Sequence, residues 1–209
     1  KINELAVSDP EQQALLKTAR RACLAGVERC QVISYSDDCA LLEELFTHDG
    51  SGTLIASDDY EQARVADIED VGGILELIEP LEHEGILLKR SRELLETEIS
   101  RFRLLERDGR IIACAALYPF PDDGCGEIAC IVSHPDYRGG QRGQRLLLEL
   151  EQEARRLGLD RVFVLTTQTA HWFIEQGFLE SSRDDLPDEK QFLYNLQRNS
   201  KVFFKKLGT

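Results

Sequence analysis

The sequence predicts an α/β protein in which helices flank a mixed β-sheet, preceded by a short α/β segment at the N-terminus. The first observation behind this class is that segments with helical and strand periodicity alternate along the chain. The second is an apolar strand, a glycine-rich loop and a long helix that follow one another at 127–157. In addition, 42% hydrophobic and 30% charged residues among 209 are typical of a globular protein.

Residues 1–57 contain signals for two helices and two short strands. The run Ser-Asp-Pro-Glu at 8–11 is typical of a helix start, and Gly26 is typical of its end. A strand is expected at 27–34, and a second, short helix is expected from Asp37. Because these elements are too few to bury a good core alone, we expect 1–57 to be the end of a larger domain.

Residues 58–209 contain the pattern of a complete domain. The expected elements are a strand at 62–66, helices at 68–78 and after Ser91, a hairpin of strands at 102–107 and 110–118, a strand at 127–132, a helix at 143–157, a strand at 161–167, a helix at 171–176 and two closing strands within 190–207. The helix at 68–78 is expected to end before Pro80. Asp108-Gly109 supplies the positive φ angles that a two-residue hairpin turn requires.

Composition and charge exclude several classes of function. The chain has 38 acidic and 25 basic residues, and its net charge of −13 argues against binding nucleic acid through a basic face. No apolar run approaches the roughly 20 residues that cross a bilayer, so we expect a cytoplasmic protein without membrane contact. Six cysteines without a CxxC pair predict buried, reduced thiols and no metal site. The chain starts at Lys1 and contains no Met, so an upstream segment is expected to be missing.

The most informative segment joins the strand at 127–132 to the helix at 143–157. Its glycines allow backbone N–H groups to close on a ligand at a helix N-terminus, where unpaired N–H groups and the helix dipole favour an anion. The loop matches neither a P-loop nor a GxGxxG motif, and by itself it also fits a flexible strand-to-helix turn. If it binds a phosphate or pyrophosphate group, the expected binding residues are Arg138, Gly139, Gly140, Gln141, Arg142 and Gly143.

This loop resembles the acetyl-CoA pyrophosphate loop of the GCN5-related N-acetyltransferases, whose pattern is Arg/Gln-x-x-Gly-x-Gly/Ala. Residues 172–178 resemble a later helix of the same family, and the order of elements in 60–207 matches its fold. Gln141 stands where the pattern has Gly, and Phe173 stands where many members have Tyr. The resemblance implies the GCN5-related N-acetyltransferase fold and acetyl-CoA as cosubstrate. It adds three strand residues to the cofactor site, Cys130, Ile131 and Val132.

Further stretches resemble the bacterial N-acetylglutamate synthases, which acetylate glutamate at the head of arginine biosynthesis. These stretches are 90–93, 112–120, 126–130, 163–167 and 198–201. Residues 41–47 and 50–53 resemble the end of the amino-acid-kinase-like domain of that family, which binds arginine as feedback inhibitor. The resemblance implies L-glutamate as the acetyl acceptor, L-arginine as an inhibitor acting through the missing domain, and a homo-oligomer for the full-length protein.

Acetyl transfer to an amine needs a base for the ammonium proton, a donor for the oxyanion and an acid for the leaving thiolate. Glu127 is the candidate base, and the alternative is an exposed carboxylate at a strand end. A backbone N–H near Ile131 or Val132 is the candidate oxyanion donor. Because the tyrosine common in the family is absent, Thr166 is the candidate acid, with Tyr194 as a weaker substitute. The alternative for Thr166 is a β-branched residue that simply suits a strand.

Glutamate carries two carboxylates, and arginine side chains are best suited to bind them. With the resemblance, Arg90 and Arg198 are the candidate pair and Ser200 is a hydroxyl partner, whereas Arg92 is expected to face water. Transfer is expected to be direct, in a ternary complex, because no Cys occupies a recognisable acyl-acceptor motif. Two alternatives stay open: an N-acetyltransferase for another small amine, and a catalytically silent regulatory module that binds acyl-CoA.

Overall fold

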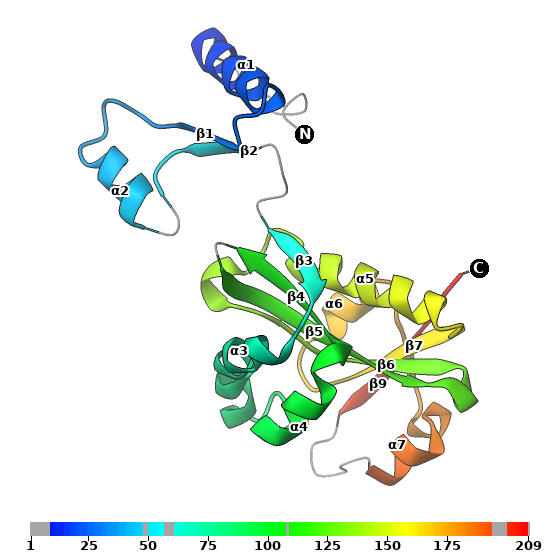
Figure 1. Cartoon of the computed structure of the whole chain (residues 1–209). Coiled ribbons are helices and arrows are strands. Elements are labelled where there is room, and N and C mark those ends of the chain that lie inside the picture. The colour runs from blue at the N-terminus through cyan, green and yellow to red at the C-terminus, as the bar shows by residue number, and fades with distance from the viewer. Residues whose placement is uncertain (1–8, 48–49, 57–60, 108, 194–199, 209) are drawn as a thin grey trace. The chain divides into compact units, whose positions relative to one another are not determined.

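The computed structural model describes residues 9–47, 50–56, 61–107, 109–193 and 200–208. The chain divides into two compact units, Lys1–Tyr60 and Glu61–Thr209. The boundary that the sequence predicts after residue 57 falls within 57–60, which lies outside the described residues. Helices α1 and α2 and strands β1 and β2 belong to the first unit, and all later elements belong to the second (Figure 1).

The first unit packs one helix against a two-stranded antiparallel sheet. Its elements are α1 (Pro10–Leu24), β1 (Arg29–Val32), α2 (Ala40–Phe46) and β2 (Thr53–Ala56). As expected, α1 begins at Pro10, and the Asp9 side chain caps it by accepting a 3.0 Å hydrogen bond from the N–H of Glu11. The buried core of this unit consists of Ala19, Cys23 and Ile55.

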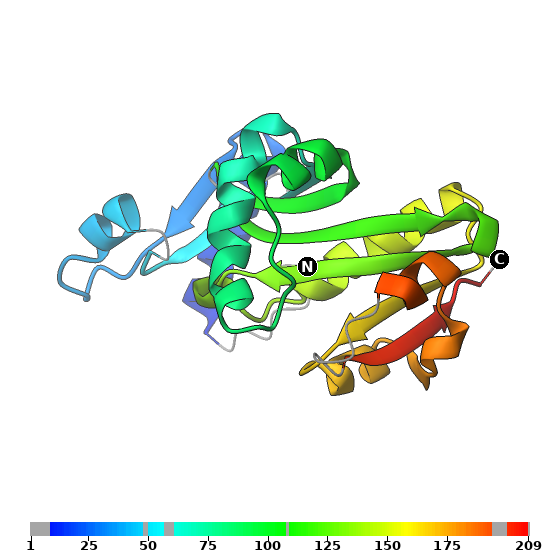
Figure 2. The ribbon, with the colours of Figure 1, turned by 90° about the horizontal axis from the view of Figure 1, so that it is seen from below.

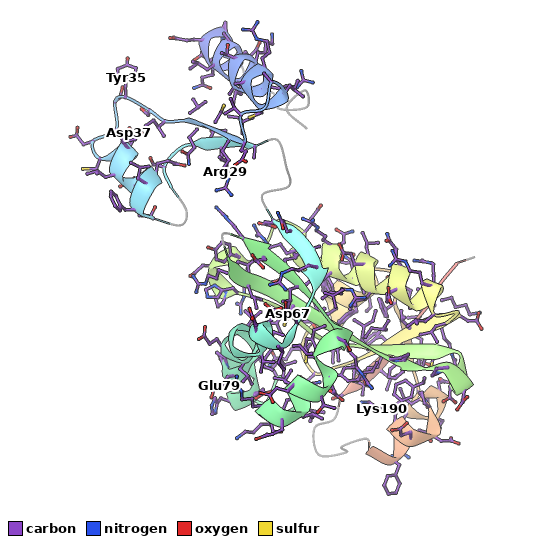
Figure 3. All side chains as sticks on the ribbon, viewed as in Figure 1. Arg29, Tyr35, Asp37, Asp67, Glu79 and Lys190 are labelled. Atoms are coloured by element: carbon purple, nitrogen blue, oxygen red, sulfur yellow. The ribbon has the colours of Figure 1, made fainter. Side chains whose placement is uncertain are left out.

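Helix α2 leaves its apolar side chains at the surface. It begins after Cys39 rather than at Asp37, because the N–H of Ala40 donates to the Asp37 carbonyl in a turn that precedes the helix. The exposed side chains are Leu41, Leu42, Leu45 and Phe46. Tyr35, labelled in Figure 3, is fully exposed in the preceding loop. In the described part of this unit, the buried core is therefore small.

The second unit contains a seven-stranded mixed sheet in the order β3-β4-β5-β6-β7-β9-β8. Its strands are β3 (Gln62–Val65), β4 (Phe102–Arg107), β5 (Arg110–Phe120), β6 (Cys125–Ser133), β7 (Arg161–Thr166), β8 (Leu179–Ser181) and β9 (Lys201–Lys206). Its helices are α3 (Val71–His83), α4 (Arg92–Glu98), α5 (Arg142–Arg156), α6 (Ala170–Glu175) and α7 (Asp188–Leu193). Only β6 and β7 pair in parallel among these neighbours. The predicted mixed sheet with flanking helices is confirmed.

Side chains of the central strands alternate between two cores, one on each face of the sheet. Helix α5 covers one face, where Leu146 and Leu150 pack in the same buried cluster as Ala113 of β5. Helices α3 and α4 cover the other face, where Ile74 packs in a cluster with Cys114 (Figure 2). The sheet therefore lies between two helical layers. None of the described helices has the length and apolarity that crossing a bilayer requires.

Helix α3 extends further than the sequence predicts. Asp67 and Asp70 form a capping box around the short 3₁₀ turn Ile68–Asp70, and the α-helix then continues through Pro80 to His83. Pro80 removes one N–H donor but leaves its own carbonyl, which accepts from the N–H of Glu84 at 3.1 Å. The expected helix end before Pro80 is therefore wrong. A proline in the last turn removes only its own N–H donor, and the helix can continue for the remaining residues.

The first of the two expected closing strands is also wrong in position. Strand β8 lies at Leu179–Ser181, before the predicted range, and Asp188–Leu193 forms helix α7 instead. The Pro187 carbonyl accepts from the N–H groups of Lys190 at 2.8 Å and Gln191 at 2.9 Å, which starts the helix. The second closing strand, β9, lies where the sequence predicts it.

Candidate active site

The site is organised by the separation of β6 from β7. Residues 125–127 of β6 pair with 161–163 of β7, and the pairing ends at Glu127. Further along β6, Cys130 has a φ of 53°, and the register with β5 shifts at the same place. Such a bulge inserts one extra residue and bends its strand. Beyond Glu127, the edge of β6 that faces β7 is therefore released from the sheet.

A cavity of about 370 Å³ lies where the two strands separate. It is lined by the second half of β6, the end of β7 and the turn after it, the end of α3 and the segment that follows it, Arg138 of the glycine loop and one residue of α6. Among the lining residues are Cys130, Ile131, Val132, Arg138, Thr166 and Phe173. The structure thus brings together four of the predicted cofactor-binding residues and the predicted acid.

The glycine loop next to this cavity has the backbone geometry of an anion site. Gly139, Gly140 and Gln141 have consecutive φ angles of 93°, 61° and 60°. Helix α5 follows, without a side-chain cap at Gln141, so its first N–H groups have no partner within the helix. No described atom lies within 4 Å of a Cβ placed on Gly139, which leaves the backbone open to a ligand. Gln141 adopts the left-handed conformation although the family pattern has Gly there.

The Arg142 side chain makes several hydrogen bonds within the protein. Its Nε donates to Glu61 Oε1 at 2.9 Å, and its Nη2 also contacts that carboxylate. Its Nη1 donates to the Tyr137 carbonyl at 2.6 Å and to the Gly139 carbonyl at 3.4 Å. The side chain is only 15% exposed. The guanidinium therefore holds the glycine loop through these hydrogen bonds, and the backbone N–H of Arg142 lies at the start of α5.

A second cavity, of about 400 Å³, is lined by Glu127 and by residues around β5, α4 and α7. Its cationic side chains are Lys89, Arg90, Arg101 and Lys190, and its anionic ones are Glu98, Glu127 and Glu189. In a chain of charge −13, this set of described lining residues is locally cationic. Of the predicted glutamate-binding residues, Arg90 lines the cavity, Ser200 is partly buried and lines neither cavity, and Arg198 lies outside the described residues.

Arg90 and Tyr118 lie side by side on the wall of the second cavity. The Arg90 guanidinium donates to the Leu88 carbonyl at 3.1 Å, and the Tyr118 hydroxyl donates to Glu98 Oε2 at 2.8 Å. Burial raises the pKa of Tyr118 well above its usual value, the nearby Arg90 charge opposes this, and the Glu98 carboxylate adds to it. The phenol therefore stays protonated. Arg92, by contrast, pairs with Glu96 at 2.9 Å on the surface, as expected.

Glu127 is buried rather than exposed at a strand end, so the alternative interpretation of this residue is wrong. Its side chain is 8% exposed, and its Oε2 lies 2.5 Å from Nζ of Lys190. The carboxylate is therefore paired with a cation and lines a cavity. It therefore meets the first requirement for a base.

Thr166 ends β7 and also faces the cofactor-side cavity. Its Oγ1 accepts from the N–H groups of Gln168 at 3.3 Å and Thr169 at 3.1 Å, and it lies 3.0 Å from Thr169 Oγ1. The hydroxyl thus shapes the turn, and its proton can go to Thr169 or to a group in the cavity. Tyr194, the weaker substitute, lies outside the described residues.

The cysteines provide no recognisable metal or acyl-transfer centre. Cys114, Cys125 and Cys130 are buried, reduced thiols, as expected, whereas Cys39 is exposed. Burial raises the pKa of the Cys114 thiol well above its usual value. None of the described residues lining the cavity around Cys130 is a histidine. Among the described residues, no group of three or more His, Cys, Asp or Glu side chains could hold a metal ion.

Sequence reasoning missed three residues of this region: Glu61, Tyr118 and Lys190. Tyr118 lies inside the matching stretch 112–120 and could have been found as a polar group ending an apolar strand. Glu61 and Lys190 gave no such signal. Their partners, Arg142 and Glu127, are distant in sequence, and only the fold brings them together.

The family of the chain follows from comparison with known proteins. A model of the acetyltransferase (GNAT) family matches residues 74–178, half of the chain, including all of β6 and the glycine loop. The chain belongs to this family. The resemblance seen in the sequence is thereby confirmed, and so is the expected GCN5-related N-acetyltransferase fold.

Similar proteins point to one group within the family. Amino-acid acetyltransferases of Pseudomonas aeruginosa and Azotobacter vinelandii are 57% and 58% identical to the chain over 196 residues, 94% of this chain and 45% of each relative. The chain thus spans about half the length of these relatives. Two structures of N-acetylglutamate synthase from Neisseria gonorrhoeae match the whole chain and about half of theirs. The one with coenzyme A and N-acetyl-glutamate has a TM-score of 0.71 at 41% identity, and the one with coenzyme A and L-arginine has 0.81 at 40%.

Proposed function

We propose that this GNAT chain transfers the acetyl group of acetyl-CoA to the α-amino group of L-glutamate. The main support for the proposal is that β6 runs from one cavity to the other. Glu127 lies in the cationic cavity, and Cys130 and Ile131, three and four residues further on, line the cavity beside the glycine loop. A single strand thus connects a site suited to an anionic amine with a site suited to a phosphate-bearing cofactor. The relatives named amino-acid acetyltransferase support the same reaction.

The pyrophosphate of acetyl-CoA would bind the backbone N–H groups of the glycine loop and the start of α5. Arg138 lines the adjoining cavity and supplies the side-chain charge. The pantetheine arm would then extend between the separated strands, where exposed backbone groups of β6 can pair with its amides. No metal ion is required at any step.

The acceptor would bind in the second cavity, with Arg90 on one carboxylate. Arg198 and Ser200 are proposed to bind the other carboxylate. Lys89 and Arg101 add positive charge around the same space. A dicarboxylate suits this cavity better than a polyamine, because the amine of glutamate is the only cation it brings.

In the reaction, Glu127 takes a proton from the ammonium of the acceptor, directly or through a water molecule. The neutral nitrogen then attacks the acetyl carbonyl, and a backbone N–H near Ile131 or Val132 stabilises the oxyanion. When the C–N bond has formed, the nitrogen loses its second proton to water, and as the C–S bond breaks the sulfur leaves as a thiolate that takes up a proton. Phe173 offers no hydroxyl, so we assign the delivery of this proton to the Thr166 hydroxyl, which is reprotonated in the same step through Thr169 or a water molecule.

Several wider properties belong to the same proposal. The reaction would be the first step of arginine biosynthesis in the cytoplasm. Residues 1–57 are proposed to be the end of an amino-acid-kinase-like domain, through which L-arginine would inhibit a homo-oligomeric full-length protein. In support, a Neisseria gonorrhoeae relative has been solved with L-arginine.

A thiol-release assay with acetyl-CoA tests the proposal by comparing glutamate with aspartate, glutamine and a simple polyamine. Thiol release with glutamate alone is the expected result. Release with another amine would replace the substrate assignment while keeping the cofactor. A chain that binds acetyl-CoA but releases no thiol with any amine would be a silent acyl-CoA-binding module, and the absence of a hydroxyl at Phe173 is the feature that favours this alternative.

A further inference from the structure

The candidate base Glu127 has a close cationic partner on a different element. Nζ of Lys190, on α7, lies 2.5 Å from Glu127 Oε2. Their side chains are 22% and 8% exposed, and both line the second cavity (Figure 3 labels Lys190). An ion pair this buried is shielded from solvent and acts more strongly than a surface pair.

The position of Lys190 is fixed by the segment that leads into α7. Leu186 is buried in a cluster with Cys125 of β6, the strand that carries Glu127, and Phe163 of the neighbouring β7. Gln191 Nε2 donates to the backbone carbonyls of Leu186 at 2.8 Å and Asp184 at 3.2 Å. Lys190 is therefore carried by an anchored helix and approaches Glu127 from a defined direction.

Other cations of the cavity do not replace Lys190 in this role. Arg90 also interacts electrostatically with Glu127, but its guanidinium donates to the Leu88 carbonyl. Arg101 lies over the Tyr118 ring at 4.9 Å. Glu98 and Glu189 add negative charge to the same cavity. Among the described cations, Lys190 is the one in direct ion-pair contact with Glu127.

We propose that Lys190 is a positioning residue for acetyl transfer: its ammonium fixes Oε2 of Glu127, so that Oε1 is presented to the incoming amine and accepts its proton. This inference rests on the proposed function. A base must be ionised before the amine arrives, and a buried carboxylate without a partner would favour its protonated form. Lys190 supplies such a partner through its contact with Oε2.

A double-mutant cycle on Lys190→Met and Glu127→Gln tests the proposal. We expect Lys190→Met to lower kcat about tenfold while leaving KM for acetyl-CoA unchanged. In the Glu127→Gln background, Lys190→Met should lower kcat no further, because the charge that it orients is already gone. Lys190→Arg, which keeps the charge, should recover part of the lost kcat.

Lys205→Met is the matched control, because it also removes a lysine from a buried Lys–Glu ion pair. Lys205 Nζ lies 2.5 Å from Glu151 Oε1, with side-chain exposures of 22% and 3%, and neither residue lines the two cavities. We expect this variant to lower the melting temperature at least as much as Lys190→Met without lowering kcat. Both variants are assayed well below their melting temperatures.

Three results would overturn the proposal. These are an unchanged kcat in Lys190→Met, an equal loss of kcat in both backgrounds of the cycle, or a raised KM for glutamate at constant kcat, which would make Lys190 a substrate-binding residue. A wild-type chain without glutamate-dependent thiol release would instead refute the proposed function itself. The two failures are therefore distinguishable.

Discussion

Arg142 and Glu61 form an ion pair next to the glycine loop, which Arg142 also holds by hydrogen bonds to its backbone carbonyls. The carboxylate binds Nε and Nη2 of Arg142, and the Glu61 carbonyl accepts from Arg145 at 3.0 Å. Since Arg142 Nη1 also binds the Tyr137 carbonyl, one guanidinium joins the loop, the start of α5 and the segment that enters β3. The loop is thus held in shape by a residue far away in the sequence.

Glu61→Gln should loosen this loop and weaken coenzyme A binding. We expect the Kd for coenzyme A, measured by isothermal titration calorimetry, to rise about fivefold, because a less ordered loop must be fixed on binding. Glu96→Gln, which breaks the exposed Arg92–Glu96 pair, is the control and should leave the Kd unchanged. Tighter binding in Glu61→Gln would contradict this account, and it would show that the released Arg142 contacts phosphate, as the sequence first suggested.

Gly139→Ala should weaken coenzyme A binding by roughly tenfold or more, because its Cβ would stand where the cofactor approaches the backbone. Gly158→Ala is a matched control: Gly139 and Gly158 have φ angles of 93° and 75°, and neither has a described atom within 4 Å of the new Cβ. Each substitution should cost about 1 kcal/mol of unfolding free energy through backbone strain. Equal Kd values in the two variants would place the cofactor elsewhere.

Arg90→Ala should raise KM for glutamate by roughly tenfold or more, because it removes a charged hydrogen-bond donor from the cavity. Arg92→Ala, two residues away, removes only a surface ion pair and should leave steady-state kinetics unchanged. Thiol release measured over a range of glutamate concentrations gives both values. Similar kinetics in the two variants would exclude Arg90 from the acceptor site.

Thr166→Val should lower kcat by roughly a hundredfold if the hydroxyl protonates the leaving thiolate. Thr166→Ser keeps the hydroxyl and should retain most of the activity. Because Oγ1 also accepts two backbone N–H groups of the turn, urea unfolding of both variants measures the structural part of the effect. A folded Thr166→Val variant with nearly normal kcat would show that Thr166 only shapes the turn.

Asp70 should stabilise the second unit in a pH-dependent way. Hydrogen bonds from Arg64, at 2.6 and 2.7 Å, hold the pKa of Asp70 below its usual value of 3.8, although burial opposes them. A lowered pKa in the folded state means that ionised Asp70 stabilises the fold above pH 3.8 and that this contribution is lost as the pH falls through the folded-state value. Asp70→Asn should therefore cost about 2 kcal/mol at neutral pH and progressively less in acid. A pH-independent loss in urea unfolding would contradict this assignment.

The sequence predicts the fold well wherever local signals and the family pattern agree. The cap at Asp9, the turn at Gly109 and the helix end at Gly158 all lie where expected, because each depends on a few neighbouring residues. Arg90 also lines a cavity and Arg92 faces water, as expected. Side chains two residues apart at a helix start can point in different directions. These features are set by short-range geometry.

Long-range features could not be predicted in the same way. The pairs Arg142–Glu61 and Glu127–Lys190 each join elements that only the folded sheet brings together. The error at 188–193 has the same origin, because Pro187 starts a helix whose anchor, Leu186, is buried against distant strands. The separation of β6 from β7 depends on a bulge at Cys130 that has no glycine to indicate it.

We propose that the chain acetylates glutamate through a cavity that recognises two carboxylates. The most direct test supplies isotope-labelled acetyl-CoA with an equimolar mixture of glutamate, aspartate and glutamine, and identifies the acetylated products by mass spectrometry. We predict N-acetylglutamate as the dominant product in the wild-type chain and its selective loss in Arg90→Ala. An equal yield of the three products, or a different dominant product, would contradict the account.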